Sequence, residues 1–146
     1  MLRINETYVK NYTIQPGHTV NDILPESAEF VGMPDVFTTG CLVAVMEWAC
    51  IEHLSPVLPD GIISLGVEMN LTHDAPCTTG TEIEIRCTVQ AATSRIVTWS
   101  VEVVSCHGYV VLGRGTHTRA TVKRAKFSKS VNQSILSIGG QRLQNP

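Results

Sequence analysis

One glutamate interrupts an otherwise apolar stretch of this chain. Between Gly40 and Ile51 every residue except Glu47 is apolar or glycine. If residues 39–54 form a helix, the side chains three and four positions from Glu47 on either side are apolar and cannot pair with its carboxylate. An ionised carboxylate buried without a partner is strongly unfavourable. Glu47 is therefore expected either to pair with a residue of another element or to serve a functional site as an acid–base group.

Two further residues could join Glu47 in such a site. His73 ends a strand-like stretch of alternating apolar residues, so its imidazole is either a satisfied core histidine or the acid–base partner of Glu47. Thr39 is either the N-cap of the helix or a group beside the free N–H donors near Gly40, which suit a polarised carbonyl oxygen. Thr39 and Glu47 would lie about 12 Å apart along a helix, so a substrate or a second chain would have to lie between them.

The helix predicted at 39–54 must position these groups. Thr38 or Thr39 can cap its start, and Ser55 followed by proline ends it. A helix on a protein surface normally shows a polar face, and this one has almost none. We therefore expect it to be buried on nearly all sides, either within the core or on assembly of subunits.

Alternating apolar and polar residues predict a series of strands around this helix. They are expected at 7–15, 65–73, 81–90, 96–105 and 109–122. Short loops between the last four predict a meander, and Gly113 and Gly115 indicate a bulge or a close backbone approach in the last strand. The apolar face of such a sheet needs a cover, and 39–54 is the long apolar helix available for it.

The predicted class is thus α+β, with an antiparallel sheet wrapped around one long buried helix. Residues 1–122 are expected to form a single domain. Residues 123–146 are basic and then polar, and are expected to form a loosely ordered tail with a short helix near 130–138.

Composition narrows the class of protein. The chain has 146 residues, of which 43% are apolar and 16% are charged, which suggests that a subunit interface covers part of the surface. A net charge of −2 argues against nucleic acid as a partner. The longest apolar run, 41–46, is far shorter than a membrane span, and the N-terminus has no signal-peptide pattern. Five cysteines without a framework spacing suggest a reducing compartment, so we expect a cytoplasmic protein without a metal site.

Three segments together resemble the fluoroacetyl-CoA thioesterase-like branch of the hotdog-fold thioesterases. They are FVGMPDVFTTGCLVAVMEWACIEHL (30–54), SLGVEMNLTHDAP (64–76) and GRGTHTR (113–119), and the resemblance extends over about residues 10–122. It implies a hotdog fold, a homodimer or higher homo-oligomer with acyl-CoA sites at the interface, and no cofactor apart from the CoA of the substrate. It also implies a catalytic set of Thr39, Glu47 and His73, and a glycine lining the acyl pocket at Gly66.

The resemblance implies hydrolysis of a short-chain acyl-CoA. Glu47 would act as general base or as nucleophile, and His73 would orient the water or protonate the leaving thiolate. Thr39 would position Glu47 or the thioester, and the backbone near Gly40 would polarise its carbonyl. Arg119 and His117 could reach the CoA moiety.

Substrate preference and the alternative function depend on other positions. Two phenylalanines form a gate in the fluoroacetyl-CoA enzyme. Phe30 fits the first place, but Met33 stands at the second, which favours another short acyl group. The alternative is a non-catalytic hotdog acyl-CoA-binding module, which would not need Glu47 and His73 together.

Overall fold

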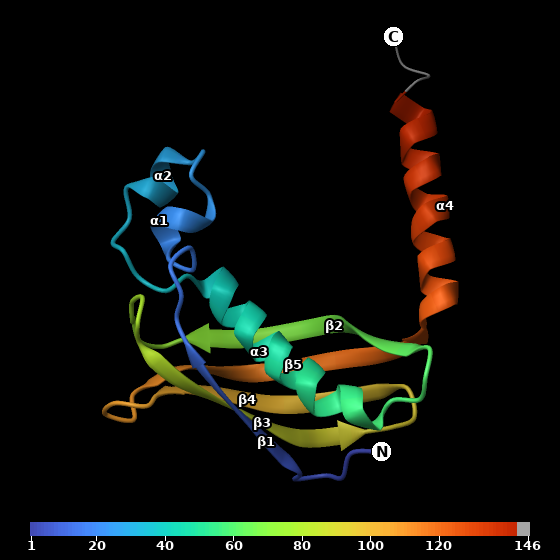
Figure 1. Cartoon of the computed structure of the whole chain (residues 1–146), viewed down its shortest axis with the longest axis horizontal. Helices are drawn as coiled ribbons and strands as arrows, with labels where there is room; N and C mark the ends of the chain where they lie inside the picture. The colour runs from blue at the N-terminus through green and yellow to red at the C-terminus, as the bar shows by residue number, and fades with distance from the viewer. Residues whose placement is uncertain (143–146) are drawn as a thin grey trace.

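The computed structural model describes residues 1–142, in which a five-stranded antiparallel sheet curls around one long helix (Figure 1). The strands are β1 (Thr7–Thr13), β2 (Ile62–His73), β3 (Glu82–Ala92), β4 (Ile96–Ser105) and β5 (Val111–Lys123). The helices are α1 (Val20–Ile23), α2 (Ala28–Val31), α3 (Thr39–Leu54), the 3₁₀ turn η1 (Ser55–Val57) and α4 (Arg124–Arg142). The hotdog fold predicted from the resemblance is confirmed.

Helix α3 has the predicted bounds, and its capping is resolved. Thr38 is the N-cap, and its hydroxyl accepts a hydrogen bond from the Gly40 N–H at 3.4 Å. The Thr39 side chain is therefore free for another contact. One face of α3 packs on the sheet, but Ala44 and Trp48 on the other face are exposed. Burial on nearly all sides is thus not reached within one chain.

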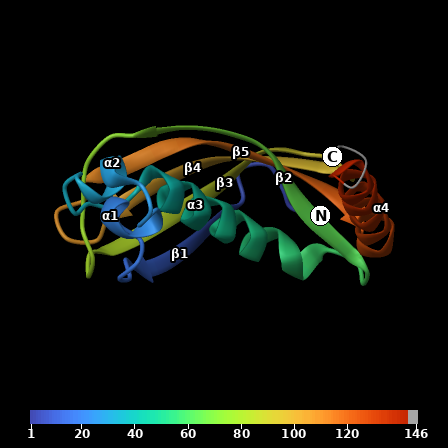
Figure 2. The same cartoon turned by 90° about the horizontal axis from the view of Figure 1, so that it is seen from above.

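The core lies between α3 and the concave face of the sheet, as Figure 2 shows from above. Leu42, Met46 and Cys50 of the helix are fully buried, as are Ile85 of β3 and Trp99 of β4. This packing holds α3 in place across the sheet, so both of its ends have defined positions relative to β2 and β5.

The order of the strands differs from the predicted meander. The sheet runs β1-β3-β4-β5-β2, so β2 pairs with β5 rather than with β3. Strand β1 takes the place beside β3, with Tyr8 opposite Cys87, and the connection after His73 crosses the end of the sheet. The short loops predicted that β2 would pair with β3. The free edge of β3 is instead occupied by β1, which is distant in sequence. As a result β2 is an edge strand with no outer neighbour in the described chain.

Two glycines of β5 confirm the close approach predicted for that strand. A Cβ on Gly113 would lie 2.6 Å from the Thr72 carbonyl oxygen, and one on Gly115 would lie 2.1 Å from the Asn70 carbonyl oxygen. The register of β4 on β5 also shifts between Val103 and Val104. Only glycine therefore lets β5 approach β2 here.

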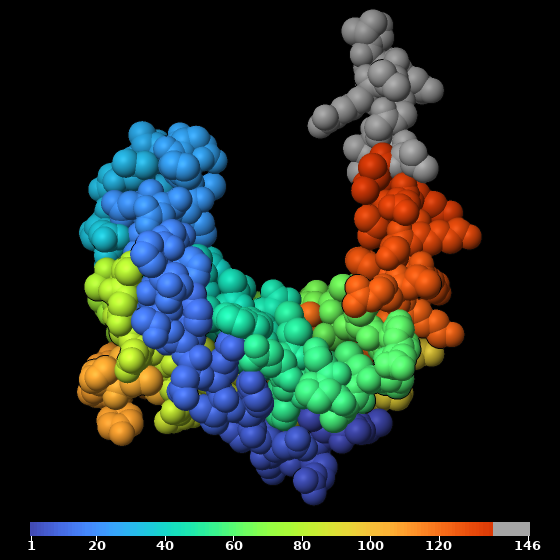
Figure 3. Space-filling model, in the orientation of Figure 1, coloured from blue at the N-terminus to red at the C-terminus, as the bar shows by residue number. Residues whose placement is uncertain are grey.

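Two projections flank the free edge of β2. At one end the segment 19–35, which contains α1 and α2 and is called the arm below, stands beyond the edge (Figure 1). At the other end α4 projects on the same side, and a hollow separates the two (Figure 3). Helix α4 is longer than the short helix expected near 130–138. The helices of residues 1–142 include none long and apolar enough to span a membrane.

Candidate functional site

Thr39 and His73 form a hydrogen-bonded pair at the start of α3. The Thr39 Oγ1 lies 2.9 Å from the His73 Nδ1. The pair forms because Thr38 is the cap, which frees the hydroxyl of Thr39, and because His73 is the last residue of β2. The other imidazole nitrogen, Nε2, is buried and has no hydrogen-bond partner among the described residues. A buried nitrogen without a partner is costly, which suggests that a ligand or water completes it.

An apolar cavity of about 520 Å³ adjoins this pair. Gly40, at the start of α3, lines the cavity together with Thr39 and His73. The arm supplies much of the remaining wall, with Val20, Ile23, Leu24 and Phe30. Phe30 thus lines this cavity, and its role as a gate stays a prediction. Met33 does not line the cavity, and 54% of its surface is exposed.

Glu47 lies further along α3 and is paired with Arg119 of β5. The Arg119 Nη1 donates to the Glu47 Oε1 at 2.6 Å, so the partner that α3 itself could not supply comes from the sheet. Arg119 is 3% exposed, whereas the Glu47 side chain is 38% exposed. In the described chain the second carboxylate oxygen, Oε2, accepts no hydrogen bond, which leaves it available for a proton or for a substrate carbon.

Arg119 is itself held by hydrogen bonds to further residues of the sheet. Its Nε donates to the Ser64 Oγ and its Nη2 to the Ser64 carbonyl oxygen, both at 2.9 Å. Its Nη1 also lies 3.1 Å from the Nε2 of buried His117. Because the guanidinium is committed to these groups, it anchors Glu47. Four of its five N–H groups are used in these contacts and one N–H of Nη2 is not, and the contact of Arg119 with CoA stays a prediction.

His117, which was predicted together with Arg119 to reach CoA, contacts Arg119 within the chain, and the sequence did not predict this contact. Its Nδ1 lies 2.8 Å from the Glu68 carbonyl oxygen and must donate there, so its Nε2 is the acceptor for Arg119. Burial lowers the pKa of His117, which favours the neutral ring that this arrangement needs. The available signal was the spacing of His117 and Arg119, which places a histidine and an arginine on one face of a strand.

Gly66 is placed beside Glu47 and not in the cavity next to Thr39. A Cβ on Gly66 would lie 2.7 Å from the Glu47 Oε1 and 3.2 Å from the His117 ring. The β2–β5 register shifts between Gly66 and Glu68, and Val67 points outward with 59% of its surface exposed. A glycine is thus needed here for the carboxylate to reach Arg119.

The described chain therefore carries two separate groups. Thr39 and His73 lie at the start of α3, whereas Glu47 lies two helical turns along it, about 12 Å away. The direct pair of His73 with Glu47 that the sequence suggested does not form within one chain. No cluster of three or more His, Cys, Asp or Glu side chains in residues 1–142 could hold a metal ion.

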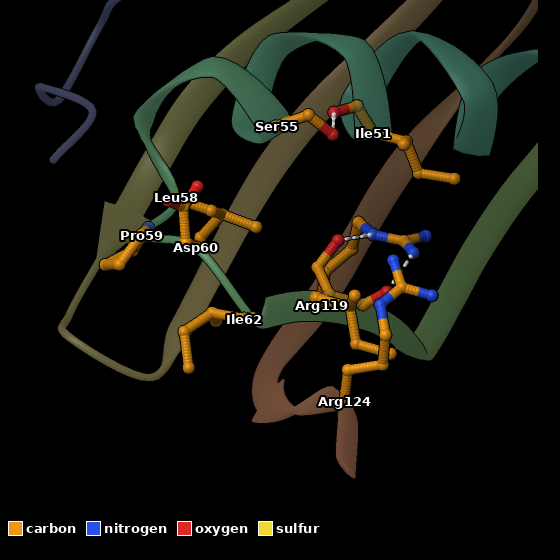
Figure 4. A pocket seen from close by; sticks show the side chains of 11 residues that line it. Ile51, Ser55, Leu58, Pro59, Asp60, Ile62, Arg119 and Arg124 are labelled. Atoms are coloured by element: carbon orange, nitrogen blue, oxygen red, sulfur yellow. Dashed lines mark hydrogen bonds between the residues drawn. The ribbon is translucent and has the colours of Figure 1, made fainter. Parts of the chain in front are cut away.

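A second cavity of about 520 Å³ lies at the opposite end of α3 (Figure 4). Ile51 and Ser55 form its helical side, and Ile62 forms part of the strand side. Arg119 and Arg124 lie together across from the helix in this view. The two ends of α3 are thus both hollowed, one beside Thr39 and the other beside Arg119.

Comparisons with known proteins identify the family of this chain. Residues 19–125 match the model of the family described as fluoroacetyl-CoA-specific thioesterase. The fluoroacetyl-CoA thioesterase of Streptantibioticus cattleyicolor is 35% identical over 133 residues, which cover 90% of this chain and 94% of that protein.

Solved structures of thioesterases share the fold of this chain. The fluoroacetyl-CoA thioesterase FlK superposes with a TM-score of 0.86 at 34% identity, over 91% of this chain and 97% of that one. A threonine-to-serine mutant of FlK in complex with acetyl-CoA matches equally well, with a TM-score of 0.86 at 33% identity over 91% and 98%. A thioesterase superfamily member from Thermus thermophilus shares the fold, with a TM-score of 0.83 at 18% identity over 94% and 96%.

Proposed function

The chain belongs to the fluoroacetyl-CoA-specific thioesterase family, and from this premise we propose that it hydrolyses a short-chain acyl-CoA thioester to the free acid and CoA. The observation that carries the proposal is the Thr39–His73 pair, whose free imidazole nitrogen adjoins an apolar cavity at a helix start. Such a cavity suits a short acyl group, and the helix start suits its carbonyl oxygen. Crystallisation of a FlK mutant with acetyl-CoA supports this ligand class.

The enzyme acts as a homodimer in this proposal. Strand β2 has a free edge, and the outer face of α3 remains exposed at Ala44 and Trp48. A free edge strand invites pairing with another strand. Two β2 strands related by a two-fold axis run antiparallel, so the His73 end of one lies beside the Ile62 end of the other.

Such pairing joins the two separate groups of the site. Glu47 lies over Gly66, in the half of β2 that faces the partner's His73 end. We therefore assign Thr39 and His73 of one subunit and Glu47 of the other to each site. This assignment resolves the distance of about 12 Å between Thr39 and Glu47 within one helix.

The chemistry follows from the free atoms. The Oε2 of Glu47 takes a proton from water as the water adds to the thioester carbonyl, or attacks the carbonyl itself to form a mixed anhydride that water then hydrolyses. The backbone N–H groups near Gly40 stabilise the developing oxyanion. As the carbon–sulfur bond breaks, the protonated His73 ring delivers its Nε2 proton to the leaving thiolate and becomes neutral, while Thr39 holds the ring in orientation. The proton released by the attacking water returns the ring to its protonated form.

The acyl group is proposed to be short and other than fluoroacetyl. Phe30 lines the cavity, whereas Met33, at the second gate position of the resemblance, lies outside it and is exposed. A flexible thioether closes the cavity less tightly than a phenylalanine ring.

We also expect a cytoplasmic location, which suits the five free cysteines.

The test is CoA release from a panel of short acyl-CoAs by the wild type and by Glu47→Gln. We expect kcat to fall by about 10²–10⁴-fold in the variant. Glu52→Gln is the matched control, because Glu52 lies on the same helix but pairs with Lys10 and Tyr8 at the surface. Turnover of no substrate would instead favour the non-catalytic acyl-CoA-binding module, and equal kcat in wild type and Glu47→Gln would contradict the catalytic role of Glu47.

A further inference from the structure

Helix α4 carries an apolar face that is exposed among the described residues. Phe127, Val131 and Ile135 recur every four residues and so lie on one side of the helix. Their exposed fractions are 38%, 37% and 60%. The helix extends away from the sheet (Figure 1), and most of it lies outside the segment that matches the family model, which ends at residue 125.

The root of α4 fixes which part of a second subunit it can reach. Arg124 follows Lys123, which pairs with Ile62 at the start of β2. In the antiparallel dimer of the proposed function, on which this inference rests, the start of β2 lies beside the partner's His73. Helix α4 therefore rises next to the end of the partner that carries the acyl cavity and the arm over it.

The arm has an exposed apolar surface, and its charge is opposite to that of α4. Val31 and Met33 are 50% and 54% exposed, although both follow Phe30, which lines the cavity. The arm contains four acidic residues and no basic one, namely Asp22, Glu26, Glu29 and Asp35. Helix α4 contains no acidic residue and begins with Arg124, Lys126 and Lys129. Opposite charges on the two segments favour their approach between subunits.

The two segments cannot meet within one chain, because the hollow over the β2 edge separates them (Figure 3). We propose that α4 of one subunit packs its Phe127–Val131–Ile135 face against the arm of the partner and holds that arm over the partner's acyl cavity. Each acyl-CoA site then depends on both chains: the arm, Thr39 and His73 of one, and Glu47 and α4 of the other.

The stripe variant Phe127→Gln/Val131→Gln tests this contact. We expect the dimer dissociation constant and the KM for acyl-CoA each to rise by about tenfold, with kcat little changed, because the arm is no longer held over the cavity. Gln133→Ala is the matched control, since this exposed, uncharged residue lies on the opposite side of the helix and has no part in the charge attraction to the arm. Circular dichroism and thermal unfolding establish that each variant is folded. Wild-type values for the stripe variant would overturn the proposal.

Mixed dimers separate contact with the partner from contact within one chain. His73→Asn has an intact α4, and the stripe variant has an intact His73. If α4 serves the partner, half of the chains in an equimolar mixture form heterodimers that each hold one intact site. At low substrate the mixture then recovers about a quarter of wild-type activity. If the mixture is no more active than the stripe variant's chains would be by themselves, the proposal is overturned.

The outcomes for α4 and for the proposed function are distinguishable. If the wild type is dimeric and active but the mixture of the two variants recovers no activity, only the role of α4 is contradicted. A wild type that hydrolyses no acyl-CoA contradicts the proposed function, and the dissociation constant of the stripe variant then decides the α4 contact by itself. A monomeric wild type contradicts the shared site and the α4 contact, while its turnover still reports on hydrolysis.

Discussion

The two ends of α3 differ in how completely their polar groups are bonded. At the start of the helix, Thr39 and His73 share one hydrogen bond, and the His73 Nε2 has no partner. Further along, Arg119 is bonded by Glu47, Ser64 and His117. Polar atoms without a partner are available to bind a substrate, whereas a network of hydrogen bonds fixes the position of one carboxylate. The difference teaches that the Thr39 end offers an open imidazole nitrogen to a substrate, whereas the Arg119 end fixes Glu47 through Oε1 and leaves Oε2 free to react.

The largest effect that tests this contrast is expected from His73→Asn. Loss of the proton donor for the thiolate should reduce kcat by about 10²–10⁴-fold and leave the free energy of unfolding nearly unchanged. The measurement is kcat for an acyl-CoA and for the same acyl group on a thiol of low pKa, which leaves without a proton. A loss of equal size on both thioesters would show that His73 does not protonate the leaving group.

A smaller effect is expected at the neighbouring threonines, which separate function from capping. Thr39→Val should lower kcat by about tenfold, because the ring of His73 loses the hydrogen bond that orients it. Thr38→Val should instead lower the free energy of unfolding by about 1 kcal/mol through loss of the cap. Steady-state kinetics and urea unfolding of both variants provide the check. The assignment is wrong if the two variants exchange these phenotypes.

Gly66→Ala tests whether the scaffold end must fit closely around Glu47. The new Cβ would lie 2.7 Å from the Glu47 Oε1, so the carboxylate must shift, and we expect kcat to fall by several-fold. The penalty should shrink in a Glu47→Asp background, because the shorter side chain leaves room. A double-mutant cycle of kcat/KM measures this coupling, and full additivity would contradict the proposed contact.

The smallest effect is expected from pH at His117. Burial holds the pKa of His117 below its ordinary value of 6.5. As the pH falls below 6.5 the unfolded chain binds the proton first, so the free energy of unfolding should decrease until the pH reaches the folded-state pKa. NMR titration of the ring gives that pKa directly. A His117→Gln variant with the same decrease in stability over this range would assign the dependence to another group.

Much of the fold could be predicted from the sequence where local patterns decide it. Helix α3 has the predicted bounds because its cap, its apolar run and its terminating proline are neighbours in the chain. The strands were found from alternation, and the close approach at Gly113 from the absence of a side chain. The order of the strands was not predicted correctly, because the pairing of β1 with β3 depends on residues some eighty positions apart.

The sequence by itself determined which residues of the candidate site carry unusual chemistry. Glu47 stood out because its own helix offers no partner, and His73 because it ends an apolar strand face. Only the tertiary structure decided how they are held: the partner of Glu47 is Arg119, 72 residues away, and the partner of His73 is Thr39. Periodicity reports which face a side chain occupies, but hydrogen bonds between elements depend on strand order and register. Those are properties of the whole packed chain, which no local pattern contains.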